Sequence, residues 1–486
     1  MVFSLIKNNK DIMKHIKYIA LLIIVSVITS CSSDFLEPAP DSGITADTYY
    51  GTADEVETGV IAIYDAWQGV NSTSLNDNHS VQYEFYLTEM RSDNTRTKSQ
   101  EGEAAQFEFY DVKATNGIVA NYYASMYNII FRSNIVLGNL EVVTNGDKAL
   151  SFEAEAKFNR ALAYFNLVRL YGDVPLIDQV ISPLDVEVQY TRVAQSSVYS
   201  LIVSDLTTAI SGLDNSYKTR ASRAAAQALL AKVQLTLGNY SEAQSLCESV
   251  MSSGYSLESN FNDVFYNERN KEIIFAIGYE SALSSDSQNF SAEWMNAVGR
   301  TSGVNYVTND VIAALDSFGG DRTQYSYRND ASQTTQNQVT KYLPNGESGG
   351  ADGKTFVNDA TLAGNDWIVL RYADVLLMHV EAILAGGNET VDSGALSSFQ
   401  KVRDRAGLTT TVTIVTKDAL LLERRVELAF ENHRLFDLVR FGRAESVLST
   451  FAAENGLGYS SSDLLLPIPQ REINLSKGLM SQNAGY

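Results

Sequence analysis

The chain has 486 residues, of which 45% are hydrophobic and 20% charged, the proportions of an ordinary globular protein with ample core material. Its formal net charge of −21 argues against a nucleic-acid-binding surface, which needs a basic stripe to neutralise phosphates. The length suits about three average domains, although a single unit of repeated helices also reaches this size.

Residues 1–30 have the pattern of an export signal. Several lysines precede an apolar run from Tyr18 to Thr29, which is well short of the ~20 residues that a membrane-spanning helix needs. The run ends in "ITSC", where small residues precede Cys31 as in a bacterial lipobox. We therefore expect residues 1–30 to be a signal peptide and Cys31 to be the lipidated first residue of the mature protein.

Residues 31–48 are expected to be a tether behind this lipid anchor. They contain Pro38 and Pro40 and too few apolar residues to fold alone. The remaining cysteine, Cys247, has no second cysteine to pair with, so an exported protein of this sequence depends on its core for stability. We expect residues 49–486 to form a single domain.

The dominant pattern past the tether is helical. Gly172 and Pro175 supply a stop after a segment whose apolar residues recur at spacings of three and four. The apolar residues of this predicted helix are Phe158, Ala161, Leu162, Phe165 and Val168.

Two further segments suggest stacked helix pairs. The small residue, turn and second helix of a tetratricopeptide repeat have counterparts in Ala231, Gly238, Tyr240 and Ala243. A second pair is expected from "WIVLRYADVLLMHVEAILAGG" onward, with one apolar face made of Val369, Ala373, Leu376, Val380 and Ile383. Such pairs bury their apolar faces only by stacking, which predicts a mainly α superhelical scaffold.

Two regions lack a sustained helical period, about 68–117 and 254–366. They are rich in Gly, Ser, Asn and Thr, and we expect long loops with a few short strands such as "EIIFAIGYE". Long loops on a rigid scaffold often carry function, so a ligand site is expected there.

The stretch 421–442 gathers acids, arginines and a histidine on an apparent helix. Glu423, Glu427 and Glu431 share one face at spacings of four, whereas His433 points roughly 200° away from Glu431 on an ideal helix. These groups cannot converge on one metal from a single helix, and the sequence holds no H-E-x-x-H, P-loop or G-x-G-x-x-G signature. A glycosidase needs two carboxylates on either side of a cleft, and sequence spacing neither establishes nor excludes such a pair here.

We interpret this charged helix as a network of Glu/Arg pairs between packed helices. We expect no catalytic residue, no metal site and no cofactor. The buried stripe of the helix is expected to be Leu422, Val426, Ala429, Phe430, Phe436 and Val439.

The order of motifs along the chain resembles a known family. After Cys31 come "YFNLVRLYGDVPLI", "ERRVELAFENHRLFDLVRFG", "LLLPIPQREIN" and the terminal "QNAGY". In this collinear order they resemble the SusD/RagB family of Bacteroidetes outer-membrane lipoproteins over essentially the whole mature chain.

The resemblance implies a SusD-like scaffold of tetratricopeptide-type helix pairs with a loop-rich ligand-binding region. Members of this family cap a TonB-dependent transporter of the SusC type, bind an oligosaccharide and act as a hinged lid that delivers it. For this chain it implies a glycan-binding protein without enzyme activity, lipid-anchored in the outer membrane and facing the cell exterior. RagB-like members handle peptides, which leaves a peptide-binding lid as the alternative; a surface glycoside hydrolase is the third hypothesis.

Candidate ligand contacts follow from the chemistry of sugars. Aromatic rings stack on the apolar face of a pyranose, while Arg, Asp and Asn bond to neighbouring hydroxyls. A core position for Trp67 and an ion pair of Arg371 with Asp374 are the structural alternatives. The predicted contacts are Trp67, Arg91, Asp93, Asn94, Trp294, Tyr306, Trp367 and Arg371, with Trp367 and Arg371 beginning a helix.

Overall fold

The computed structural model describes only part of the chain. The described residues are 49–70, 77–97, 101–182, 184–281, 283, 285–295, 305–329, 337–343 and 361–486. The predicted signal peptide, Cys31 and the tether lie outside them. Two compact units are distinguished, Met1–Glu55 and Val56–Tyr486, and all elements below belong to the second except the first turn of α4.

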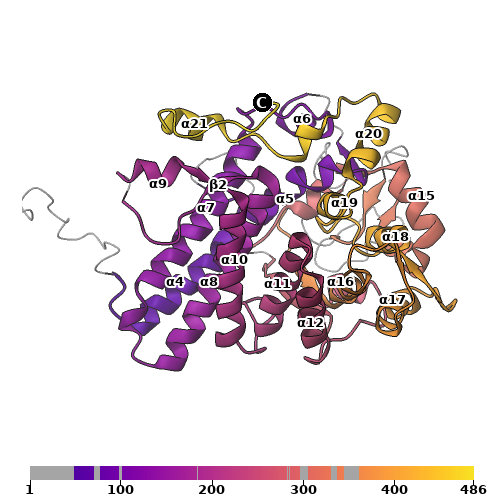
Figure 1. Cartoon of the computed structure of the whole chain (residues 1–486), viewed down its shortest axis with the longest axis horizontal. Helices are drawn as coiled ribbons and strands as arrows, with labels where there is room; N and C mark the ends of the chain where they lie inside the picture. The colour runs from indigo at the N-terminus through magenta and orange to yellow at the C-terminus, as the bar shows by residue number, and fades with distance from the viewer. Residues whose placement is uncertain are drawn as a thin grey trace, which may run out of the picture. The chain divides into compact units, whose positions relative to one another are not determined.

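Long helices form the N-terminal part of the second unit, coloured indigo to magenta in Figure 1. The side chain of Asn145 accepts a hydrogen bond from the backbone of Lys148 and so begins α8, which ends where Gly172 adopts a φ of 75°. This confirms the predicted helix and its stop. Helix α8 packs against α7 and α10. The long helices are α4 Ala53–Gln68, α7 Gly117–Gly138, α8 Gly146–Tyr171 and α10 Gln195–Gly212.

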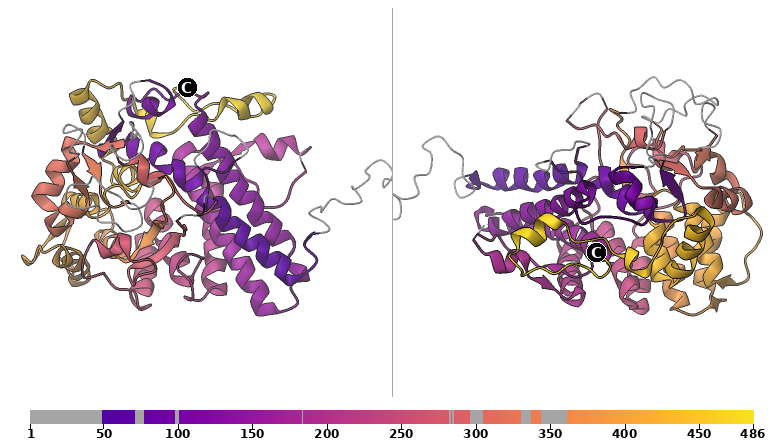
Figure 2. Two further views of the ribbon diagram at one scale, coloured as in Figure 1. Left: turned by 180° about the vertical axis from the view of Figure 1, so that it is seen from behind. Right: turned by 90° about the horizontal axis from the view of Figure 1, so that it is seen from above.

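The predicted helix pairs follow, and they stack. Gly238, with a φ of 77°, ends α11 and turns the chain into α12, which packs against α16 of the second pair. Figure 2 shows the magenta-to-orange part of the chain to one side of the indigo and purple long helices, and α11 packs against α10. A mainly α scaffold of tetratricopeptide-type pairs is therefore confirmed. The pairs are α11 Arg223–Leu237 with α12 Tyr240–Met251, and α16 Tyr372–Leu384 with α17 Ser393–Arg405.

The expected single helix through 421–442 is wrong. The chain forms α18 and α19 with a break between them, because Phe430 and Asn432 adopt φ values of 67° and 63° that no right-handed helix accommodates. The expected buried stripe is confirmed only in part, since Val439 is 48% exposed and Leu422 and Phe436 are half-buried, whereas Val426, Ala429 and Phe430 are buried. The C-terminal helices are α18 Lys417–Glu427, α19 Arg434–Arg440, α20 Ala444–Asn455 and α21 Gln470–Leu475.

The region 68–117 holds helices that the sequence pattern did not reveal. In α5 every residue except Glu84 is buried, so no polar face marks the helix. The shorter helices are α5 Ser80–Leu87, α6 Glu103–Glu108, α9 Val186–Tyr190, α13 Asp263–Tyr266, α14 Phe290–Glu293 and α15 Asn309–Phe318, with 3₁₀ turns at η1 Glu89–Arg91, η2 Leu140–Val142, η3 Gly320–Tyr325 and η5 Ser461–Leu464.

Strands are few and short in the described part of the chain, and each pairs antiparallel with one other. The predicted strand in "EIIFAIGYE" is confirmed as β4 Ile273–Ile277, which pairs with β8 Trp367–Arg371. Trp367 and Arg371 therefore lie in a strand and do not begin a helix; α16 starts at Tyr372. The other pairs are β1 Thr95–Thr97 with β5 Asn305–Val307, β2 Val174–Pro175 with β3 Arg192–Val193, β6 Tyr327–Arg328 with β7 Gln338–Val339, and β9 Glu389–Thr390 with β10 Val415–Thr416.

Among the residues described, no helix combines the length and the apolar character needed to cross a membrane.

Candidate ligand-binding site

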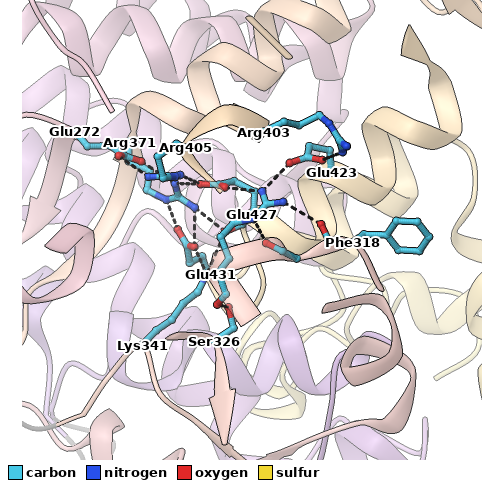
Figure 3. Close-up of polar contacts among 12 residues, drawn as sticks. Glu272, Phe318, Ser326, Lys341, Arg371, Arg403, Arg405, Glu423, Glu427 and Glu431 are labelled. Carbon is cyan, nitrogen blue, oxygen red and sulfur yellow. Dashed lines mark hydrogen bonds and ion pairs between the residues drawn. The ribbon is translucent and has the colours of Figure 1, made fainter. Parts of the chain in front are cut away.

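The glutamates of the 421–442 stretch belong to a buried network of ion pairs, drawn in Figure 3. Arg371 lies 2.6 Å from Glu427, 2.7 Å from Glu431 and 2.9 Å from Glu272. All four side chains are at most 2% exposed. We call the full set the charged network; its other members are Arg322, Lys341, Arg403, Arg405 and Glu423.

Cations keep Glu427 and Glu431 of the charged network ionised. Burial alone would raise the pKa of Glu427, but Arg405, Arg371 and Arg322 hold it well below its ordinary value. Burial lowers the pKa of Lys341 to about 8, and the Glu431 carboxylate opposes that shift. The acids are thus paired and shielded from solvent, which confirms the interpretation of this stretch as structural.

The histidine of the stretch, His433, is not a cationic group at neutral pH. Burial lowers the pKa of His433 to about 3, with Lys232 adding to the shift, so the imidazole is neutral. Within the described ranges, no group of three or more His, Cys, Asp and Glu side chains is placed to hold a metal ion.

The predicted contacts of the first loop region are buried as well. Asp93 is 3% exposed, accepts hydrogen bonds of 2.7 and 2.9 Å from Arg434 and lies 2.9 Å from Arg425. The two arginines hold the pKa of Asp93 well below its ordinary value against the effect of burial. Asn94, 0% exposed, accepts a 3.0 Å hydrogen bond from Arg425. The side chains of Asp93 and Asn94 thus anchor the chain before β1 to α18 and α19. Arg91 donates to the carbonyls of Leu87 and of Asp463 in η5.

The predicted tryptophans lie in the core. Trp67 is 2% exposed and donates a 2.9 Å hydrogen bond to Asn159, which fits the structural alternative for this residue. Trp294 and Trp367 are 0% and 4% exposed, and both pack against the ring of Tyr342. The ligand-contact role of these three residues, and of Arg91, Asp93, Asn94 and Arg371, stays a prediction, now set against the internal contacts of each side chain.

Tyr306, the remaining predicted contact, lies at an open pocket. It stands opposite Arg96 in the register of β1 and β5, so both side chains project from the same face of that strand pair. We call this hollow of about 390 Å³ the Arg96–Tyr306 pocket. It is lined by Arg96, Tyr306, Val307, Thr308, Asn309 and Asp310, and by Phe451, Glu454 and Asn455 of α20.

Polar groups in the Arg96–Tyr306 pocket are held in fixed positions. Arg96 lies 2.6 Å from the buried carboxylate of Glu108 and donates a 2.9 Å hydrogen bond to Asn455. Glu108 also accepts a 2.6 Å hydrogen bond from the backbone of Thr97, which fixes the strand that carries Arg96. Burial raises the pKa of Tyr306, so its hydroxyl stays protonated at neutral pH and can both donate and accept. The pocket thus offers a ring, a guanidinium, amides and carboxylates to a neutral polar ligand.

Arg96, Asn455 and Glu454 were not among the predicted contacts. Strand alternation identifies Arg96, since Thr95 and Thr97 are 1% exposed whereas the Arg96 side chain between them is 26% exposed. No local signal identifies Asn455, because α20 reaches this pocket only through the tertiary fold. Residues 98–100 and 296–304, which adjoin the two strands in sequence, lie outside the described residues.

Comparison with known proteins places the chain in a family. A profile described as "SusD family" matches residues 214–486, and one described as "Starch-binding associating with outer membrane" matches residues 34–235. A SusD-like protein of Bacteroides ovatus is 27% identical over 469 residues, covering 87% of this chain and 82% of that protein. The starch-binding protein SusD of Bacteroides thetaiotaomicron is 25% identical over 434 residues, covering 74% and 76% of the two chains.

Solved structures agree. A structure named as a laminarin-binding SusD-like protein has a TM-score of 0.75 at 26% identity and covers 90% of this chain and 100% of its own. Surface glycan-binding protein A of Bacteroides thetaiotaomicron, in complex with laminarihexaose, has a TM-score of 0.75 at 22% identity, with 89% and 99% coverage, and supports the fold. The first profile alone spans more than half of the sequence, and the helical scaffold is shared throughout. The chain belongs to the SusD family.

Proposed function

We propose that this protein is a glycan-binding lipoprotein of the cell surface that captures an oligosaccharide in the Arg96–Tyr306 pocket. The observation that carries the proposal is the pairing of a tyrosine ring with a fixed guanidinium in an open polar pocket. A pyranose presents an apolar face to such a ring and adjacent hydroxyls to the surrounding Arg, Asn and carboxylate groups.

The comparisons support a saccharide as the ligand. The similar structure at 26% identity is named for laminarin, and the relative from Bacteroides thetaiotaomicron for starch. Because Glu423, Glu427 and Glu431 are paired inside the charged network, we propose that the protein binds its ligand without turning it over.

Calorimetric titration against a panel of polysaccharides tests the ligand class. The panel holds laminarin, starch, xyloglucan, acidic polysaccharides and peptides. Saturable binding of a polysaccharide, with unchanged chain length on chromatography after long incubation, is the expected result. Binding of peptides alone would favour the peptide-binding alternative, and release of shorter sugars would establish the hydrolase.

We further propose that the lipid on Cys31 holds the protein at the outer membrane and that it serves as a hinged lid on a SusC-like TonB-dependent transporter. Two or more acyl chains give stable anchoring, whereas one holds a protein only marginally. Co-purification with a barrel protein from solubilised outer membranes is expected. Metabolic labelling with radioactive palmitate should mark the parent protein and not a Cys31→Ala variant, and equal labelling of the two would disprove the anchor.

A further inference from the structure

A second open pocket lies away from the Arg96–Tyr306 pocket and shares none of its lining residues. It measures about 520 Å³ and is bordered by α8, α10, α11, α12 and α19. Its apolar wall consists of five leucines with Val168, Phe436 and Val439. Val439 and Leu237 are 48% and 40% exposed. We call it the Arg169 pocket. Its volume suits a ligand of roughly two amino-acid residues, in the range of ordinary small-ligand sites.

The charge of the Arg169 pocket is opposite to that of the whole protein. The chain carries a net charge of −21, yet the described residues that line this pocket include two arginines and no aspartate or glutamate. A local positive potential inside an apolar wall selects ligands that are both anionic and apolar.

One of the two arginines is already neutralised. Arg440 lies 2.5 Å from one oxygen of Glu381, donates to its other oxygen at 2.8 Å and bonds to Asp437 at 2.8 Å. Arg169 differs. Its guanidinium is stacked between the rings of Phe165 and Phe436, with 3.8 Å to each ring centroid.

Arg169 forms no ion pair with any residue that the structure describes. Its Nε donates 3.0 Å to the carbonyl of Phe165 and its Nη2 donates 2.6 Å to the amide oxygen of Asn166, both neutral acceptors. Burial lowers its pKa to about 10, so it stays charged at neutral pH. Glu84 interacts with it only at longer range, and burial raises the pKa of Glu84 to about 7. A largely desolvated cation without a counter-ion is unfavourable, and an anionic ligand would relieve it.

We propose that the Arg169 pocket binds the C-terminal end of a peptide whose last residue is apolar. In such a residue the carboxylate and the apolar side chain leave the same Cα, so one reaches Arg169 while the other packs against Leu235 and Leu435. Tyr199 lines the pocket next to Arg169 and offers a hydroxyl to the same carboxylate. Arginine and carboxylate form the stronger, charge-assisted kind of hydrogen bond. This inference is independent of the glycan proposal.

Titration of the full-length protein with N-acetyl-Phe-Leu tests the pocket. We expect saturable binding, weakened about tenfold to a hundredfold for the same peptide with an amidated C-terminus, because a hydrogen bond to a charged group is lost. Octanoate, an anion with an apolar chain but no peptide, should bind more weakly than the acid peptide. Equal affinity for the acid and the amide, or octanoate binding as tightly as the peptide, would overturn the proposal.

A matched pair of variants locates the site. Val439→Glu places a negative charge at the pocket wall and should weaken peptide binding by about tenfold or more through like-charge repulsion. Val391→Glu is the control, since Val391 is 69% exposed and does not line the pocket. Unchanged affinity in a folded Val439→Glu variant would show that the peptide binds elsewhere. The comparison of acid and amide uses the unmodified protein, so it holds even if that variant fails to fold.

Discussion

The charged network and the Arg96–Tyr306 pocket both concentrate polar side chains, yet they differ in what those side chains face. In the charged network every acid is paired with cations inside the protein. Glu427, for example, contacts three of them, Arg322, Arg371 and Arg405. At the pocket, Arg96 is also paired, but it remains 26% exposed beside the ring of Tyr306. The charged stretch of the sequence therefore belongs to the scaffold. The candidate binding site is instead distinguished by polar and aromatic side chains that remain partly exposed.

Removing the central acid of the charged network should have the largest effect. Glu427→Ala leaves three buried arginines short of a counter-charge, and we expect the free energy of unfolding to fall by about 3–5 kcal/mol. Urea denaturation measures this. The control is Asp418→Ala, whose exposed pair with Arg443 should contribute at most about 0.5 kcal/mol. Similar small losses in both variants would contradict the distinction between scaffold and surface.

Asp93 can be assigned either to the scaffold or to the binding site, because it was predicted as a ligand contact and is buried against arginines. Asp93→Asn weakens the pairing with Arg434 and Arg425, and we expect a loss of about 2–3 kcal/mol in unfolding free energy. Glycan affinity of the folded variant should stay within about threefold of the parent, less than the change expected from a lost direct contact. A large loss of affinity with unchanged stability would instead establish Asp93 as a contact.

Glu89, in the 3₁₀ turn just before Asp93, should make the stability of the protein depend on pH in the opposite direction to the paired acids. Burial raises its pKa from 4.5 to about 7, so the folded state favours the protonated form. That contribution to stability is complete below pH 4.5 and is lost as the pH rises through about 7. Glu89→Gln should therefore match the parent near pH 4.5 and exceed it by about 3 kcal/mol at pH 8. Thermal unfolding at both pH values measures this, and a difference that does not change with pH would refute it.

Local pattern predicted the scaffold, whereas the surroundings of the predicted ligand contacts could not be predicted from it, for physical reasons. Helix α8 and the α11–α12 pair follow from residues close in sequence: Asn145 begins a helix, and Gly172 and Gly238 end helices. By contrast, Trp67 bonds to Asn159, 92 residues away, and Asp93 bonds to Arg434, 341 residues away. Composition could not show that Trp67 and Asp93 would have these internal partners, and their contact with a ligand stays a prediction.

The smallest effect, and the one that bears directly on function, concerns the ring of Tyr306. Tyr306→Ala should weaken glycan binding by about 1–2 kcal/mol, roughly tenfold, because the stacking surface is lost while partly exposed Tyr306 contributes little to the core. Tyr306→Phe keeps the ring and should retain most of the affinity. Tyr217→Ala is the matched control, since Tyr217 is 50% exposed and lies outside the pocket. If Tyr306→Ala and Tyr217→Ala bind glycan equally well, incomplete burial is not the mark of the binding site, and the contrast with the charged network loses its functional meaning.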